Sequence, residues 1–156
     1  MNNISKHINY KEATKSATAL RLGIDNTPGE YELQNMELIA EKVFEPLRKA
    51  INGPIKINSF YRCEKLNKAI GGSIKSQHCQ GRAIDIDDLY GYATNSFMYD
   101  YIKNNLDYDQ IIWEFGTDKN PDWIHVSYVD GDSNRKRCLK AIKENGKTKY
   151  IDITNV

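Results

Sequence analysis

The chain has 156 residues, of which 40% are hydrophobic and 28% are charged, and its formal net charge is +1. A chain of this length and apolar content can bury one hydrophobic core, so residues 1–156 are interpreted as a single domain. The near-neutral charge argues against a nucleic-acid partner, and no apolar run is long enough to span a membrane.

The N-terminus and the cysteines bear on the compartment of the protein. Residues 1–10 lack the apolar segment of a secretory signal peptide, which predicts a cytoplasmic location unless another route releases the protein. Cys63, Cys79 and Cys138 form no closely spaced pair. We therefore expect free buried thiols rather than a disulfide or a CxxC metal motif.

The N-terminal third of the sequence predicts helices. Residues 10–22 form a short helical segment closed by Gly23, and Asn26-Thr27-Pro28-Gly29 is a strong turn signal. From residue 30 to 51 apolar residues recur at helical spacing, which predicts a second, longer helix. Pro46 is expected to bend that helix or to break it, because proline lacks the backbone N–H.

The remainder of the sequence alternates between strand and helix patterns. Strands are expected at residues 55–62, 82–87, 110–115 and 123–129, helices at 64–70 and 95–105, and edge strands at 138–142 and 150–153. Helices come first and most strands follow. The order predicts an α+β fold with N-terminal helices and a mostly antiparallel sheet.

Two histidines and one aspartate have the spacing of a metal site. Gly81 permits a tight turn after His78, and the next strand carries Asp85 on the face opposite two core isoleucines. His125 occupies a polar face of a later strand, and antiparallel pairing of the two strands would bring all three side chains to one ion. Two imidazoles, one carboxylate and an open position for water suit catalytic zinc. Cys79 points to the other side of its segment and is not counted as a ligand.

Two acidic residues compete for the role of general base. Asp122 lies three residues before His125, which in a regular strand would place it on the opposite face. Because Asn120-Pro121 is a turn signal, we expect Asp122 to lie at the mouth of the site, before regular pairing begins, and we favour it as the base. Glu114 is the alternative base, a hydrogen-bond partner for a ligand imidazole, or an ion-pair partner of a lysine.

These residues match the pattern of a known family over about residues 5–142. The chain resembles zinc D-Ala-D-Ala carboxypeptidases and their relatives, the vancomycin-resistance D-Ala-D-Ala dipeptidases and the phage L-alanyl-D-glutamate endopeptidases that act as endolysins. The N-terminal segment is similar to phage-type members. The motifs that carry the resemblance are His78-x-x-Gly81-x-Ala83-x-Asp85, Asp122-x-x-His125, Ser59-Phe60-Tyr61-Arg62 and Ser76-x-His78.

The resemblance implies a fold and a set of roles. It implies a small α+β domain of the hedgehog/DD-peptidase type in which one zinc ion is held by His78, Asp85 and the later histidine. Asp122 would be the general base, at a position where many relatives have Glu. Arg62 would stabilise the developing oxyanion or hold a substrate carbonyl or carboxylate, and Ser76 would line the substrate cleft.

The expected function is zinc-dependent hydrolysis of amide bonds in peptidoglycan stem peptides, by a D-Ala-D-Ala carboxypeptidase or an endolysin-type endopeptidase. The expected partner is the peptidoglycan peptide, without nucleic acid or membrane, and the chain is expected to be a monomer. A phage-encoded enzyme released by a holin fits the missing signal peptide. Two alternatives remain: a non-catalytic, zinc-containing wall-binding or virion structural module, and a cytosolic D-Ala-D-Ala dipeptidase. Residues 90–95 and 116–121 are expected as the cleft-lining loops that set which bond is cut.

Overall fold

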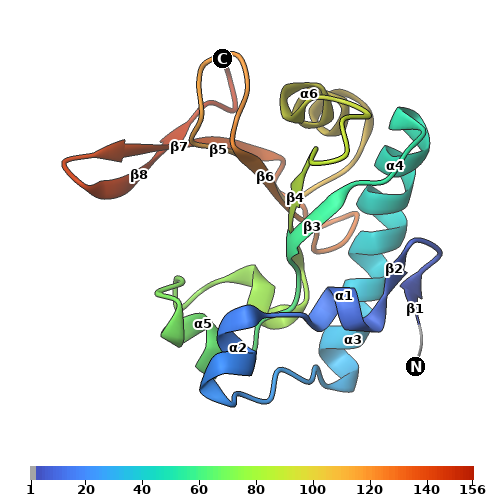
Figure 1. Ribbon diagram of the computed structural model, residues 1–156. Helices are drawn as coiled ribbons and strands as arrows, with labels where there is room; N and C mark the ends of the chain where they lie inside the picture. Colours follow the sequence, from blue (N-terminus) through green and yellow to red (C-terminus); the bar gives the residue numbers. More distant parts are fainter. Residues whose placement is uncertain (1–2) are drawn as a thin grey trace.

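A computed structural model describes residues 3–156 (Figure 1). The N-terminal elements are β1 (Asn3–Ser5), β2 (Ile8–Asn9), α1 (Tyr10–Thr14), α2 (Ala17–Leu22), α3 (Glu30–Ile39), the π-helical η1 (Ala40–Phe44) and α4 (Glu45–Ile51). The later helices are α5 (Glu64–Ala69), the 3-10 helix η2 (Gln77–Gln80) and α6 (Asn95–Asn105). The later strands are β3 (Lys56–Ser59), β4 (Ala83–Asp87), β5 (Gln110–Glu114), β6 (Trp123–Ser127), β7 (Arg137–Glu144) and β8 (Lys147–Asp152).

The helix predicted over residues 10–22 is two helices, so that prediction was wrong in its continuity. Lys15 and Ser16 adopt extended backbone conformations between α1 and α2. The Ser16 hydroxyl accepts a hydrogen bond from the Ala19 amide at 3.1 Å and so begins α2 as its N-cap. Gly23 ends α2 in the left-handed conformation, as expected.

The helix predicted over residues 30–51 is present, and its break takes the form of a π turn. The segment η1 joins α3 to α4 without leaving helical backbone angles. Pro46 lies in the first turn of α4, directly after this widened turn. Because proline cannot donate the usual backbone hydrogen bond, a π turn at this place keeps the helix continuous.

The six-stranded sheet has the order β3-β4-β6-β5-β7-β8, and each neighbouring pair is antiparallel except β5 and β7. This confirms the predicted α+β fold with N-terminal helices and a mostly antiparallel sheet. Residues 138–142 were predicted as an edge strand, but β7 lies between β5 and β8, and the two edge strands of the sheet are β3 and β8. In Figure 1 the β7–β8 hairpin projects away from α4, on the same side of the molecule as α5.

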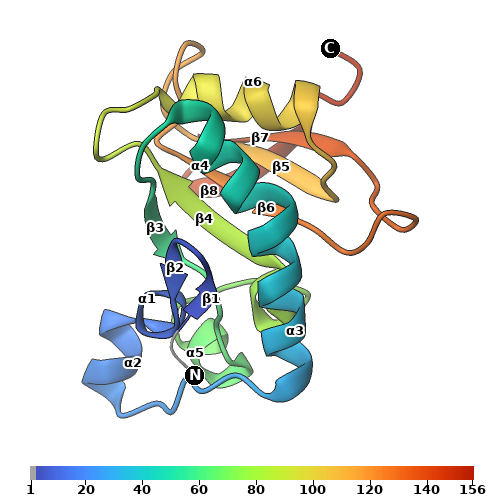
Figure 2. The ribbon, with the colours of Figure 1, turned by 90° about the vertical axis from the view of Figure 1, so that its right-hand side faces the viewer.

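One face of the sheet packs on helices and the other face is left for the site. Ile84 and Ile86 of β4 and Ile124 and Val126 of β6 are buried, in one core cluster with residues of α3, α4 and α6. Figure 2 shows α4 and α6 on this side of the sheet. Alternation along each strand turns the intervening residues to the opposite face. No helix among residues 3–156 is long and apolar enough to cross a bilayer.

Gly81 fixes the approach of the η2 loop to α3. Its φ is +72°, a left-handed backbone conformation that glycine adopts without strain. A Cβ at this position would overlap the carbonyl oxygen of Glu32 in α3. The loop that carries His78 therefore packs against α3 only because residue 81 has no side chain.

We expect Gly81→Ala to lower the free energy of unfolding by about 2–4 kcal/mol, from left-handed strain plus overpacking. Gly23→Ala is the matched control, because Gly23 has a φ of +66° and nothing within 4 Å of the added Cβ. It should cost only about 1 kcal/mol. Urea unfolding of both variants measures the difference, and equal losses would contradict the role of the close approach to α3.

Candidate metal centre

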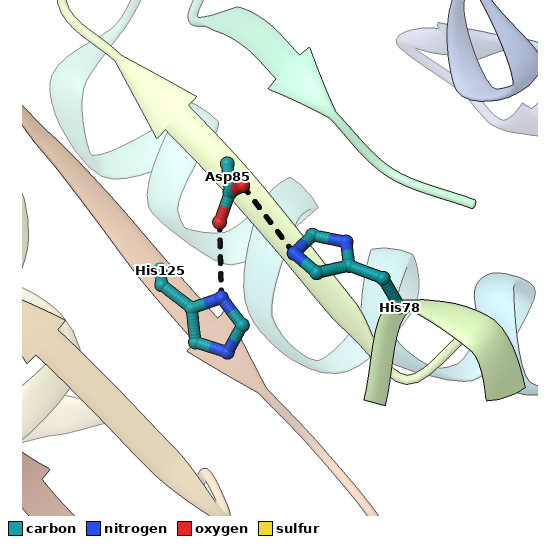
Figure 3. A group of neighbouring side chains, drawn as sticks. All are labelled: His78, Asp85 and His125. Atoms are coloured by element: carbon teal, nitrogen blue, oxygen red, sulfur yellow. Dashed lines mark hydrogen bonds and ion pairs between the residues drawn. The ribbon is translucent and has the colours of Figure 1, made fainter. Parts of the chain in front are cut away.

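The side chains of His78, Asp85 and His125 converge on one point (Figure 3). Asp85 of β4 pairs directly with His125 of β6, and Asp85 Oδ1 lies 3.0 Å from His125 Nδ1. Asp85 Oδ2 lies 3.3 Å from His78 Nε2, which η2 supplies from outside the sheet. Among residues 3–156, this is the one group of three or more His, Cys, Asp or Glu side chains whose candidate ligand atoms all lie within 4.8 Å of one another.

The hydrogen bond of His78 prepares its other ring nitrogen for a metal. His78 Nδ1 lies 2.6 Å from the carbonyl oxygen of Phe60, an acceptor, so Nδ1 carries the proton and donates it. Nε2 then has its lone pair free, as a ligand imidazole requires. His78 is 1% exposed, and Nε2 has no hydrogen-bond partner within the described part of the chain. A buried nitrogen that makes no hydrogen bond and lies 3.3 Å from the Asp85 carboxylate fits a zinc ligand.

The electrostatics of the group also fit a divalent cation. Burial lowers the pKa of His78, and the nearby Asp85 carboxylate offsets this only in part, so the imidazole is held neutral. Burial alone would raise the pKa of Asp85, but His78 and His125 outweigh it and hold that pKa well below its ordinary value. A neutral imidazole and an ionised carboxylate are the protonation states that bind zinc.

The group lies in a cleft of about 640 Å³ on the face of the sheet that the helices do not cover. The segment between α5 and η2 forms one wall, and the β7–β8 hairpin forms another. The described residues that line the cleft are Arg62, Gly71, Gly72, Ser73, Lys75, Ser76, Gln77, His78, Asp85, Gln110, Ile112, Glu114, Phe115, Trp123, His125, Arg135, Leu139, Lys143, Thr148 and Tyr150. The predicted loops 90–95 and 116–121 do not line it, so that expectation was wrong.

Arg62 and Ser76 lie together in the cleft wall next to His78. Arg62 Nη2 donates to Ser76 Oγ at 3.4 Å, and the Arg62 amide donates to the His78 carbonyl oxygen at 3.2 Å. Burial lowers the pKa of Arg62, although the Asp85 charge opposes this shift. The guanidinium is thus fixed beside the metal ligands and open to the cleft.

Glu114, and not Asp122, presents its carboxylate to the cleft. The β5–β6 pairing sets Glu114 opposite Trp123 and Ile112 opposite His125, so Glu114 shares the face of the candidate ligands. The Asp122 amide donates to the Glu114 carbonyl oxygen at 2.9 Å, so backbone pairing with β5 begins before the first residue of β6. Asp122 is exposed and outside the cleft lining.

The environment of Glu114 differs from that of Asp85. Glu114 is 6% exposed. Burial raises its pKa to about 7; the nearby His125 lowers it and the Asp85 charge raises it. A carboxyl group with a pKa near neutrality can exchange protons at working pH.

Sequence reasoning missed several cleft residues. Gln77, Gln110, Arg135, Lys143 and Tyr150 line the cleft. Alternation along β5 from Ile112 could have identified Gln110, because both share the face of Glu114. Gln77 lies between the predicted site residues Ser76 and His78. No local signal marks the other three, because their positions depend on pairing between distant segments.

Comparison with protein-family models gives a match to Peptidase M15 over residues 6–127. The chain belongs to the peptidase M15 family. This confirms the resemblance to the zinc D-Ala-D-Ala carboxypeptidases, and it supports a zinc metallopeptidase that acts on substrates of the peptidoglycan type. Comparison with individual curated proteins gives no significant match. The matched region includes all three candidate ligands and ends before β7.

We expect the purified protein to bind about one zinc ion per chain, since three ligands and one open position complete a tetrahedral catalytic site. His125→Ala should lose stoichiometric zinc, measured by elemental analysis after dialysis. His7→Ala is the matched control, because His7 contacts Glu45 and lies outside the cleft lining. Full zinc content in the His125 variant would refute the assignment of that ligand.

Proposed function

We propose that this protein is a zinc peptidase that hydrolyses amide bonds in peptidoglycan stem peptides, with zinc held by His78, Asp85 and His125. The observation that carries the proposal is the convergence of His78, the ionised Asp85 carboxylate and His125 in an open cleft that also holds Glu114, a separate carboxyl group with a pKa of about 7. Zinc in such a site lowers the pKa of water and polarises the scissile carbonyl.

We assign the general base to Glu114 in place of Asp122. Glu114 shares the cleft with the candidate ligands, and its raised pKa matches the task of taking a proton from water and giving it to the leaving amine. Asp122 precedes β6, is exposed and does not line the cleft. A separate base of this kind argues against a purely structural zinc module.

Arg62 is proposed to stabilise the oxyanion that forms on the scissile carbonyl. Its guanidinium lines the cleft beside His78 and stays protonated at neutral pH. Preformed donors at a developing negative charge are among the largest contributions to amide hydrolysis. Ser76 holds the Arg62 side chain and lines the same wall, which supports its proposed role in the substrate cleft.

The extent of the cleft along the strands supports an endopeptidase of the endolysin type. On the cleft face, Glu114 and Trp123 lie to one side of His125, and Gln110 lies to the other. Same-face neighbours along a strand are about 7 Å apart, so the floor extends beyond the metal in both directions. A peptide can therefore continue past the scissile bond on both sides.

Glu114→Gln should keep zinc and lose at least about a hundredfold in kcat/KM, as expected for removal of a general base. Asp122→Asn is the matched control and should stay within about threefold of the wild type, because its side chain lies outside the cleft. The measurement is release of peptides from purified peptidoglycan, followed by mass spectrometry with and without chelator. The reverse ranking of the two variants would return the role to Asp122.

The pH profile gives a second readout of the same assignment. Below its pKa of about 7, the Glu114 carboxyl is protonated and cannot accept a proton, so kcat/KM should rise with pH through this region. The positive charge of bound zinc moves this limb towards lower pH. In Glu114→Gln, the remaining kcat/KM should no longer rise with pH through this region. If the rise is unchanged in that variant, it belongs to the titration of another group.

A further inference from the structure

We propose that Arg135 is a specificity-determining residue that binds a carboxylate of the peptide substrate, in a subsite formed with Gln77 and Gln110. This subsite lies on the Gln110 side of the metal centre, away from Glu114. The inference rests on the proposed function, since it names a chemical group of that substrate. Arg135 lies outside the family-matched residues 6–127.

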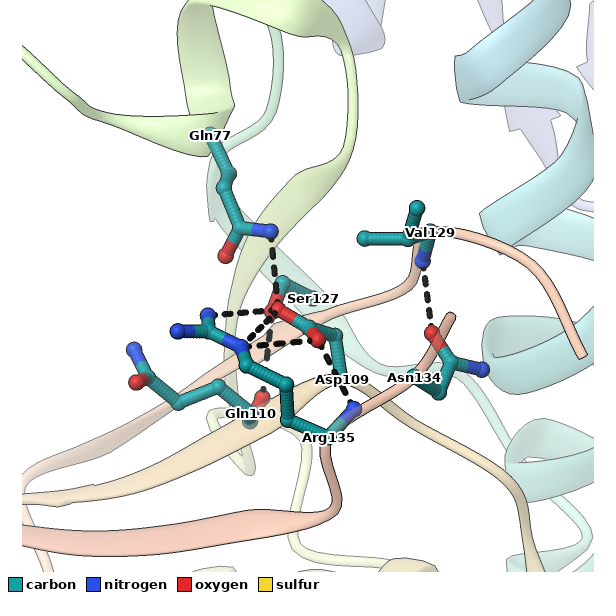
Figure 4. A network of polar contacts seen from close by, with 7 residues as sticks. All are labelled: Gln77, Asp109, Gln110, Ser127, Val129, Asn134 and Arg135. Atoms are coloured by element: carbon teal, nitrogen blue, oxygen red, sulfur yellow. Dashed lines mark hydrogen bonds and ion pairs between the residues drawn. The ribbon is translucent and has the colours of Figure 1, made fainter. Parts of the chain in front are cut away.

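A buried carboxylate holds the Arg135 guanidinium in place (Figure 4). Asp109 is 1% exposed and accepts hydrogen bonds from Arg135 Nε at 3.0 Å, from Nη2 at 2.7 Å and from the Arg135 amide at 2.9 Å. The bonds from Arg135 raise its own pKa, and they outweigh the burial that would otherwise raise the pKa of Asp109. The pair therefore stays ionised, and the guanidinium is oriented before substrate binds.

The exposed edge of the same guanidinium is available to a ligand. The side chain of Arg135 is 50% exposed and lines the cleft. Within residues 3–156, its guanidinium donates only to Asp109, through Nε and Nη2, which leaves Nη1 without a hydrogen-bond partner. A purely structural role, in which Arg135 holds the loop before β7 through Asp109, would not require the guanidinium to line the cleft. Because Asp109 balances its charge, recognition depends on directed N–H donors, which suit a carboxylate.

The two glutamines of the subsite lie next to the metal centre. Gln77 directly precedes His78, and its Nε2 donates to Asp109 Oδ2 at 2.9 Å. Gln110 shares the cleft face of β5 with Ile112, which pairs with His125. One same-face step along a strand is about 7 Å, so a carboxylate at Arg135 would lie one or two residues from the scissile bond. Stem peptides carry carboxylates at that separation.

The test uses the pentapeptide L-Ala-γ-D-Glu-L-Lys-D-Ala-D-Ala and two derivatives, one amidated at the α-carboxylate of Glu and one at the C-terminus. KM and kcat are measured with zinc-loaded protein, and Kd values are measured by calorimetry on Glu114→Gln protein. In the wild type, one of the two amidations should raise KM and Kd about tenfold or more, the loss expected when a charged hydrogen bond is removed.

Arg135→Ala should abolish that discrimination by raising KM for the parent peptide to the level of the amide, with kcat within about twofold. Arg135→Lys keeps the positive charge but loses the paired N–H donors of the guanidinium, so its penalty for amidation should be intermediate. This variant also controls for a folding defect in Arg135→Ala. Arg137→Ala, a nearby arginine outside the cleft lining that pairs with Asp152, should behave as the wild type.

The proposal is overturned if the penalty for amidation persists in Arg135→Ala, or if the wild type shows no penalty for either amidation. These outcomes are separate from a failure of the proposed function. If zinc-loaded wild-type protein cleaves no peptide, the peptidase assignment fails, while the calorimetric Kd values still report whether Arg135 recognises a carboxylate.

Discussion

The antiparallel pairing of β4 with β6 is the constraint on which the site depends. It sets Asp85 directly opposite His125 and, on the other face, Ile84 and Ile86 opposite core residues of β6. A slip of β4 by one residue would move Asp85 into the core and the two isoleucines into the cleft, while His125 stayed in place. The free energy of burying the isoleucines therefore enforces the register that assembles two of the three candidate ligands.

The third candidate ligand, His78, is positioned by a helix and not by strand pairing. His78 lies on the short η2 helix, whose close approach to α3 depends on Gly81, and the Phe60 carbonyl at the end of β3 orients its ring. The strands β4 and β6 thus position Asp85 and His125, and the packing of η2 on α3 positions His78. This leaves the opposite face of the sheet open, and there Glu114 is buried enough for its pKa to rise while Asp85 is held ionised. Two carboxyl groups on one face acquire different chemical roles from their surroundings.

Local sequence patterns predicted the elements and the candidate ligands, because period-two alternation decides which residues share a face of a strand. The same rule, applied without exception, would have placed Asp122 on the face opposite His125. The expected turn at Asn120-Pro121 led instead to the prediction that Asp122 lies at the mouth of the site and acts as the base. In the structure the Asp122 amide already pairs with β5, and Asp122 is exposed and outside the cleft lining. Arg135 and Lys143 carried no such signal, since their places follow from the parallel pairing of β5 with β7 and from the Asp109 ion pair. Long-range pairing of this kind leaves no local trace in the sequence.

The most direct test of the account is X-ray absorption spectroscopy at the zinc edge of the zinc-loaded protein. The account predicts a first shell of nitrogen and oxygen only, with two imidazoles, one carboxylate and one solvent oxygen at about 2.0–2.2 Å. A sulfur scatterer at about 2.3 Å would place a cysteine such as Cys79 in the coordination sphere. That result, or a single imidazole in the shell, would contradict the site formed by His78, Asp85 and His125.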